Sequence, residues 1–243
     1  MNNTLICGVD LETSGVSVTN DAPVQVGVVL RLHDHGSYAD YPAVNMLCNP
    51  GKPIEPGATA VHGITDAQVA YTPSAYDVVR YMAQTVAYYA HGRTAFTVGF
   101  NSSNFDIPMA NHVLGYEAFS LPHIDVLRLI RFKFPGARGS LGGKKLGEMY
   151  EVFLGRPLQN AHDAIVDISA TLDLLEALQQ RTGMSMAEIA EEQSQPHPYQ
   201  ILPLGRYIGL PIAEVPRSWA TFMQDKDLDP DLRATVDTIL ARP

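Results

Sequence analysis

The chain has 243 residues, of which 46% are hydrophobic and 18% charged, and its formal net charge at neutral pH is −9. This length and composition allow one large domain with a full core, or one domain with a small appendage. The acidic balance argues against a general nucleic-acid coat, no apolar run approaches the ~20 residues that span a bilayer, and the amino terminus lacks a secretory signal pattern. We therefore expect a soluble, cytoplasmic protein that does not enter membranes.

The predicted elements are three strands followed by helices and a further strand. Valine-rich alternating or apolar runs predict strands over residues 4–10, 23–32, 41–50 and 94–100. Apolar residues at helical spacing predict helices over residues 73–90, 103–115, 144–155 and 160–180. This order indicates a mixed sheet covered by helices, an α/β or α+β architecture.

The chain changes character after Gly183. A short acidic run predicts a helix, a segment with Pro and Gln reads as a linker, and a compact tail follows with its own Trp219. We predict three parts: a main domain over residues 1–183, an acidic helix and linker over 184–200, and a small module over 201–243.

The first predicted strand ends in the sequence GVDLET, which places Asp10 and Glu12 two residues apart. Alternate residues of a strand point to the same face, so these two carboxylates are expected to lie side by side. Their like charges repel one another unless a cation neutralises them. The pair therefore indicates a metal site at the end of the strand.

Three further residues have the chemistry to complete such a site. Asp106 follows the fourth strand, and His162 precedes Asp167 by five residues on the longest predicted helix. Each has an ordinary alternative, since Asp106 can cap a helix and His162 can be a surface residue. Four converging carboxylates, however, are tolerable only with divalent cations, and oxygen ligands favour Mg²⁺ or Mn²⁺.

This set of residues predicts hydrolysis at phosphorus. Two divalent ions suit in-line displacement, because they activate the attacking water and stabilise the leaving oxygen. A histidine, whose ordinary pKa is about 6.5, can accept a proton from that water near neutral pH.

One basic segment stands out in the acidic chain. Residues 126–147 contain no Asp or Glu, and their cations are Arg128, Arg131, Lys133, Arg138, Lys144 and Lys145. The segment lies between the motifs of Asp106 and Asp167, so we interpret it as a track for a nucleic-acid strand. The alternative is a solvated run of surface charges.

The motifs resemble those of the DEDD exonuclease superfamily, in the histidine-bearing DEDDh branch that includes the epsilon proofreading subunit of bacterial DNA polymerase III. DLETSG, NSSNFD and AHDAIVD resemble its three motifs, and VHGIT resembles its segment beside the terminal nucleotide. The resemblance covers about residues 4–180 and implies a ribonuclease H-like, mixed five-stranded sheet flanked by helices. It implies the metal ligands Asp10, Glu12, Asp106 and Asp167, with His162 as general base. It also implies substrate contacts from Leu11, Thr13, His62, Ile64, Asn101 and Phe105.

The tail is similar to the small carboxyl-terminal module of exodeoxyribonuclease X-like proteins. Leu204 replaces the usual Phe of that module, and Ile208 replaces its usual second Lys. The basic contacts of the common module are therefore not expected here. Two interpretations stay open: the module packs on the main domain, or it binds a partner protein.

The resemblance implies a metal-dependent 3′-to-5′ exonuclease with a role in DNA replication or repair. Its expected substrate is single-stranded DNA or the 3′ ends of DNA, its products are nucleoside 5′-monophosphates, and its cofactor is a pair of Mg²⁺ ions that Mn²⁺ can replace. One alternative is an RNA-trimming exonuclease of the same superfamily. Another is a non-catalytic subunit that binds nucleic acid.

Overall fold

A computed structural model describes residues 4–34, 37–138 and 144–242, with side chains except those of residues 33–38. Its centre is one sheet in the order β3-β2-β1-β4-β5. The strands are β1 (Thr4–Thr13), β2 (Pro23–Asp34), β3 (Ser37–Leu47), β4 (Thr94–Gly99) and β5 (His123–Asp125). Strands β1, β2 and β3 pair antiparallel, whereas β4 and β5 run parallel to β1. The predicted mixed five-stranded sheet is confirmed.

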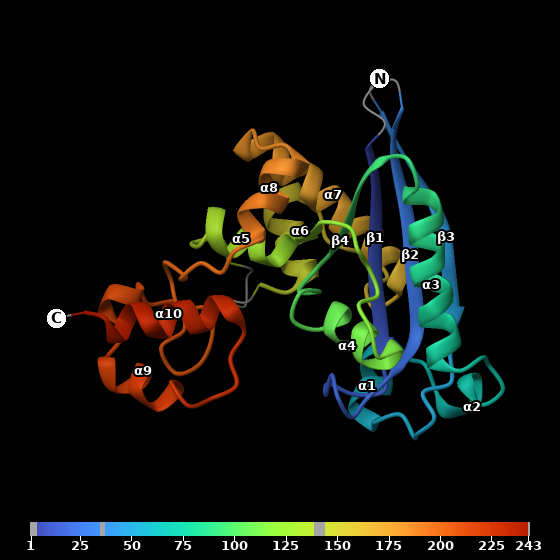
Figure 1. Cartoon of the computed structure of the whole chain (residues 1–243), viewed down its shortest axis with the longest axis horizontal. Helices are drawn as coiled ribbons and strands as arrows, with labels where there is room; N and C mark the ends of the chain where they lie inside the picture. Colours follow the sequence, from blue (N-terminus) through green and yellow to red (C-terminus); the bar gives the residue numbers. More distant parts are fainter. Residues whose placement is uncertain (1–3, 35–36, 139–143, 243) are drawn as a thin grey trace.

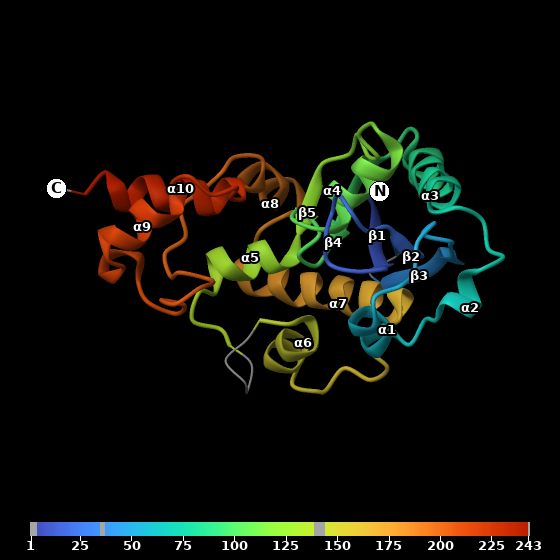
Figure 2. The same ribbon diagram turned by 90° about the horizontal axis from the view of Figure 1, so that it is seen from below.

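Helices cover both faces of this sheet (Figures 1 and 2). They are α1 (Pro56–His62), α2 (Asp66–Val69), α3 (Ala75–Ala90), α4 (Asp106–Leu114), α5 (Val126–Lys133), α6 (Leu146–Leu154), α7 (Ala164–Thr182), α8 (Met186–Gln193), α9 (Arg217–Met223) and α10 (Pro230–Leu240). Figure 2 shows α3 and α4 on one side of the sheet and α7 on the other. Within the described residues, no helix is both long and apolar enough to cross a membrane.

The alternation of side chains along β1 decides which residues face which layer. Leu5, Cys7, Val9 and Leu11 lie in the cluster of buried residues that includes α3, whereas Ile6 lies in the cluster that includes α7. Because successive side chains of a strand point to opposite faces, Asp10 and Glu12 share the α7 face with Ile6. The predicted side-by-side placement of these two acids follows directly.

Two glycines allow α7 to lie close against the sheet at this point. A Cβ atom on Gly8 would collide with Ile168 of α7. A Cβ on Gly27 of β2 would lie 2.8 Å from Ile168 Cδ1 and 2.9 Å from the Cβ of Ala164. Larger residues would push the amino-terminal half of α7 outward, because a core does not give way by that much. The close approach brings the first turns of α7 to the end of β1.

Helix α8 packs on the main domain rather than extending into solvent. Its Met186 and Ile189 are buried in the same cluster as Leu178 of α7. The Gln193 side chain, at the end of α8, accepts a hydrogen bond from the backbone N–H of Asp125 at 2.9 Å and donates one to the Asp125 carbonyl at 3.1 Å. This short helix therefore supports β5 at the edge of the sheet.

The carboxyl-terminal segment has its own small core. Tyr199, Leu202, Trp219 and Val236 are buried together there, away from the two clusters of the sheet. In both views α9 and α10 lie beyond α5, at the opposite end of the molecule from α3 (Figures 1 and 2). A separate core agrees with a separate module, although the three-part division of the chain stays a prediction.

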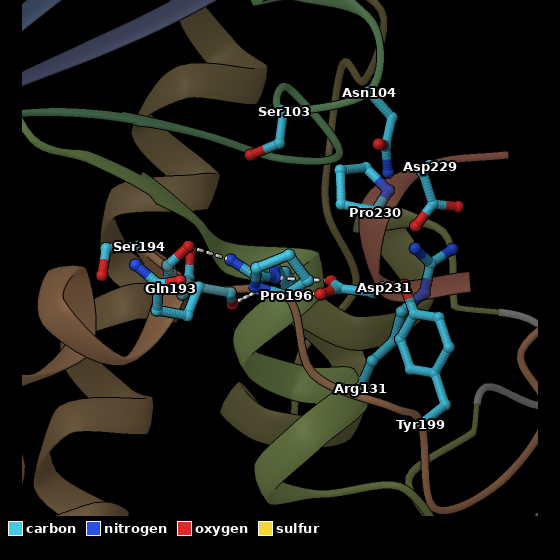
Figure 3. Close-up of a pocket in the computed structure, with 12 residues that line it drawn as sticks. Ser103, Asn104, Arg131, Gln193, Ser194, Pro196, Tyr199, Asp229, Pro230 and Asp231 are labelled. Atoms are coloured by element: carbon cyan, nitrogen blue, oxygen red, sulfur yellow. Dashed lines mark hydrogen bonds and ion pairs between the residues drawn. The ribbon is translucent and has the colours of Figure 1, made fainter. Parts of the chain in front are cut away.

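An ion pair joins this module to the main domain. Arg128 of α5 donates to Asp231 of α10 through Nε at 2.6 Å and Nη2 at 2.8 Å, and also to the carbonyls of Gln193 and Gln195. The Arg128 side chain is 14% exposed and that of Asp231 8%. Figure 3 shows Asp231, Gln193, Tyr199 and Arg131 among the residues that line a pocket at this junction. Paired charges this well enclosed hold the module in one position.

We expect Arg128→Met to lower the free energy of unfolding by about 3 kcal/mol, because it leaves the Asp231 carboxylate enclosed without its partner. Lys133→Met, on the same helix, is the matched control. Lys133 forms an ion pair with Glu192, and the two side chains are 33% and 34% exposed. Loss of this pair should lower the free energy of unfolding by less than ~1 kcal/mol. Urea unfolding of both variants measures the difference. Equal losses would show that the Arg128 pair does not fix the module.

Candidate active site

The site begins where β1 ends. Asp10 pairs across the ladder with Gly27, and the register of β1 against β2 shifts between Glu12 and Thr13. Asp10 and Glu12 are both half-buried. Gly27 has no side chain, and Ile168 and Ala164 of α7 occupy the place where its Cβ would lie. The two acids therefore face the helix that carries Asp167.

Asp106 reaches the same place from the other side of β1. It is the first residue of α4 and is buried, with 6% of its surface exposed. Its Oδ1 atom accepts a hydrogen bond of 3.0 Å from the backbone N–H of Leu11, the residue between Asp10 and Glu12. A contact across 95 positions of sequence thus fixes the second motif against the first.

His162 lies before α7 rather than on it, which corrects the prediction. The helix begins at Ala164, and Asp163 caps it by accepting hydrogen bonds from the N–H groups of Ile165 and Val166. His162 is exposed and has a left-handed backbone with φ 71°. Its backbone N–H donates to Asp167 Oδ2 at 3.2 Å. The cap turns the chain away from the helix, so the imidazole stands at the rim of the site.

The charges of the four acids act on one another. Burial raises the pKa of Asp10 well above its usual value, and the carboxylates of Asp106, Glu12, Asp167 and then Asp163 raise it further. Burial, with Asp167 and Asp106, raises the pKa of Glu12 to about 7. Burial also raises the pKa of Asp106 to about 7, against the hydrogen bond from Leu11, and raises that of Asp167. The other three carboxylates thus act on Asp10, and two of them act on Glu12, whereas their joint role as metal ligands stays a prediction.

The acids fit a divalent cation, although they do not form a closed cage. In the described part of the chain, no three His, Cys, Asp or Glu side chains gather tightly enough to define a metal site on geometry alone. However, Asp167 Oδ1 is buried and accepts no hydrogen bond. A buried oxygen without a donor is costly, and a hard cation satisfies both it and the mutual repulsion of the acids.

Thr13 and His62 form one border of the site. His62 Nδ1 accepts a hydrogen bond of 3.0 Å from the N–H of Ile64, so its Nε2 carries the proton and donates to the Thr13 carbonyl at 3.1 Å. Burial lowers the pKa of His62, and the nearby His162 lowers it further. Burial and His162 thus favour the neutral form of His62, against the hydrogen bond to Thr13, and the two bonds fix its ring beside the end of β1. The Ile64 side chain is buried in a separate small cluster.

Other predicted substrate residues contribute through the backbone. The Leu11 side chain lies in the core on the α3 side, and the half-buried Phe105 ring packs against the same cluster. Asn101 has a left-handed backbone with φ 61°, and its N–H donates to Asp125 Oδ1 at 3.0 Å. The roles of all these residues toward a substrate stay predictions.

Asp125 is a site-forming residue that the sequence analysis missed. It is 1% exposed and accepts hydrogen bonds from the N–H groups of Asn101 and Ser103, both at 3.0 Å, and of Arg128 at 3.2 Å. It therefore caps α5 and holds the loop that leads to Asp106. An Asp directly before the amphipathic run VLRLIRFK is a helix-start signal that could have revealed it.

The basic segment contributes to the site in part. The ion pairs of Arg128 and Lys133 direct these two residues to the carboxyl-terminal module and to α8, so they are not available as a track. The other four cations, Arg131, Arg138, Lys144 and Lys145, line a groove of about 550 Å³ that also contains His162 and Asn101. Residues 139–143 of the segment lie outside the described residues.

Comparison with known sequences places this arrangement in a family. The sequence profile of the RNase_T family, described as an exonuclease family, matches residues 7–175. An epsilon-like DNA polymerase III subunit of Rhodobacter capsulatus is 31% identical over 180 residues, which are 71% of this chain and 24% of that protein. A PolC-type DNA polymerase III of Streptococcus suis is 30% identical over 169 residues, 68% of this chain and 10% of that protein. The chain thus spans a minor part of these two relatives. The epsilon subunit of Buchnera aphidicola is 27% identical over 69% of each chain.

Solved structures share the fold. Exonuclease X in complex with 5′-overhanging duplex DNA has a TM-score of 0.56 and 24% identity, over 76% of this chain and 98% of that one. The complex of Escherichia coli exonuclease I with single-stranded DNA has a TM-score of 0.59 and 19% identity, over 74% of this chain and 41% of that one. Profile, sequence relatives and fold agree: the chain belongs to the RNase_T exonuclease family, within the DEDD exonucleases, and has a ribonuclease H-like fold.

Proposed function

We propose that this exonuclease removes nucleoside 5′-monophosphates from the 3′ ends of single-stranded or frayed DNA, with Mg²⁺ as cofactor and Mn²⁺ as a substitute. The observation that carries the proposal is the unpaired, buried Oδ1 atom of Asp167 beside acids whose pKa values are all raised, that of Asp10 by burial and by the carboxylates of Asp106, Glu12 and Asp167. Exonucleases of this family generally depend on divalent metal ions.

Each residue has a role that follows from its position. Asp10, Glu12, Asp106 and Asp167 would hold two divalent cations, which supply charge stabilisation and water activation when bound. His162, which is exposed and whose backbone N–H donates to Asp167, would accept a proton from the attacking water. His62 and Thr13 would border the terminal nucleotide.

The substrate follows from charge and from the neighbours. Two proteins of the same fold were solved with duplex DNA bearing a 5′ overhang and with single-stranded DNA. In this chain, a groove beside His162 contains four cations although the whole chain carries a net charge of −9. A local concentration of Lys and Arg in an acidic protein favours a phosphate backbone at that one place. A protein partner for the carboxyl-terminal module also stays a prediction.

The charge of Lys144 should make strand binding depend on pH. Its Nζ donates to the carbonyls of Phe134 at 3.2 Å and Pro135 at 3.3 Å, while burial and the neighbouring Arg138 and Arg131 lower its pKa to about 8. Lys144 therefore loses its positive charge as the pH rises through about 8, and the attraction for phosphate falls with it.

The measurement is the Kd for labelled oligothymidylate at pH 7 and at pH 9, in EDTA to prevent cleavage. We expect the increase in Kd over this range to be roughly five- to tenfold larger for the parent protein than for Lys144→Arg, because arginine keeps its charge. The arginine variant corrects for the carboxylates of the site, which also become more negative over this range. Identical pH dependence in the two proteins would remove Lys144 from the binding groove.

Digestion of oligonucleotides labelled at either end, with Mg²⁺, Mn²⁺ or chelator, tests the proposed function. The expected result is stepwise loss from the 3′ end, release of 5′-mononucleotides, and no cleavage in chelator. Matched DNA and RNA substrates in the same assay identify the sugar preference. Release from the 5′ end, or full activity in chelator, would contradict the proposal.

A further inference from the structure

The groove beside the site is built from two distant parts of the chain. Its lining includes His162 and Asn101 of the site, the cations Lys144 and Lys145, and Pro203 and Ile208 of the carboxyl-terminal segment. The family profile ends at residue 175, so Pro203 and Ile208 lie outside the part of the chain that it describes. One wall of the groove therefore comes from this chain's own module.

The loop that forms this wall is held in a defined conformation. The N–H of Leu202 donates to the carbonyl of Leu210, and the N–H of Gly209 donates back to the carbonyl of Leu202, both at 2.9 Å. Gly209 has φ 87°, and a Cβ there would lie 3.1 Å from Nη2 of Arg138, so the loop lies directly against a cation of the main domain. Leu202 itself is fully buried. These contacts fix Pro203 and Ile208 at the edge of the groove.

A second set of contacts fixes the module that carries the loop. The Arg128–Asp231 ion pair is enclosed, and the rings of Phe132 on α5 and Tyr199 stack with centroids 5.1 Å apart. The ion pair lies between the main domain and the module, and the stacked rings lie between the main domain and the segment directly before the module. These contacts hold the carboxyl-terminal segment against the main domain, so the wall of the groove is a fixed part of the fold.

The chemistry of the groove matches a single nucleic-acid strand. A strand offers phosphates along one edge and the flat, apolar faces of its bases along the other, and proteins bind it with cations and apolar side chains together. Here Lys144 and Lys145 are on the main domain, whereas Ile208, 54% exposed, presents an apolar surface on the module. The exposed Ile208 side chain is therefore accessible to a ligand in the groove.

We propose that Pro203 and Ile208 contact the bases of the substrate strand next to its 3′-terminal nucleotide, so that the carboxyl-terminal module is part of the substrate-binding surface. This inference rests on the proposed function, since it assigns a position to the same strand.

The test is the affinity for a fluorescent oligothymidylate of twelve nucleotides, measured by anisotropy in EDTA so that no cleavage occurs. Ile208→Asp removes the apolar contact and places a negative charge beside the strand, so we expect its Kd to rise roughly five- to tenfold. Phe222→Asp is the matched control. Phe222 is 66% exposed on the same module and does not line the groove, so its Kd should stay within about twofold of the parent value.

Thermal unfolding verifies that both variants fold, as expected for exposed positions. An Ile208→Asp protein that binds as tightly as Phe222→Asp would overturn the inference. A parent protein that binds the oligonucleotide in the groove but releases no mononucleotide with Mg²⁺ or Mn²⁺ would refute the proposed function and leave the groove assignment in place. Metal-dependent cleavage with an unchanged Kd for Ile208→Asp would refute the groove assignment alone.

Discussion

Asp10→Asn should reduce hydrolysis by at least about 10³-fold and, at the same time, make the metal-free protein more stable by about 1–3 kcal/mol. Activity falls because Asp10 is central to the acid cluster: the carboxylates of Asp106, Glu12 and Asp167 all raise its pKa. Stability rises for the same reason, since an amide of similar size relieves that repulsion. Thermal and urea unfolding in chelator, with mononucleotide release in Mg²⁺, measure the two effects.

The opposite signs distinguish a metal site from a structural cluster. If Asp10 were structural, its loss would lower stability, and activity would fall only with the folded fraction. Asp237→Asn, an exposed position on α10, is the control and should change neither quantity. An Asp10→Asn protein that is less stable in chelator than the parent would contradict the assignment.

The same cluster should give the metal-free protein an unusual dependence on pH. The folded protein raises the pKa of Glu12 and of Asp106 to about 7, whereas both groups titrate near pH 4 in an unfolded chain. Between these values the folded state binds more protons, so the stability contributed by these groups is present at low pH and is lost as the pH rises through about 7. Divalent cations oppose this loss, because they bind the ionised form. The stabilisation by Mg²⁺ should therefore increase from pH 6 to pH 8.

Periodicity in the sequence predicts four of the five strands and the longest helices. The alternation that starts at Leu5 fixes both the buried face of β1 and the direction of Asp10 and Glu12, and this information is entirely local. Strand β5 has three residues, too few to show a period, and it was not predicted. Helix α5 is not predicted, because its apolar stripe of Val126, Leu129 and Ile130 is short and is interrupted by the cations of the basic segment.

Other features depend on contacts between distant segments and could not be read from the sequence. Arg128 and Lys133 do not line the groove with the other basic residues, because they form ion pairs with Asp231 and Glu192. These two acids lie far along the chain from their partners. The groove wall at Ile208 likewise exists only because the module docks on α5. Local patterns identify which residues can do chemistry, whereas tertiary partners decide which of them are available to do it.

Replacing His162 should slow turnover by roughly 10² to 10⁴ if its imidazole is the general base. His162→Asn is the suitable variant, because Asn tolerates the left-handed backbone at φ 71° better than Ala does and keeps the chain turn before α7 intact. The imidazole is exposed at the rim, so added imidazole should reach the vacated position and restore part of the rate.

The neighbouring Asn160 provides the control for backbone effects in this argument. It too is exposed and left-handed, with φ 55°, but it has no place in the proposed chemistry. Asn160→Ala should therefore cost about 1 kcal/mol of stability through strain while kcat stays near the parent value. If His162→Asn turns over as fast as the parent, or if Asn160→Ala is slowed equally, the proton acceptor is not His162. The raised pKa of Glu12, about 7, would then make that carboxylate the next group to test.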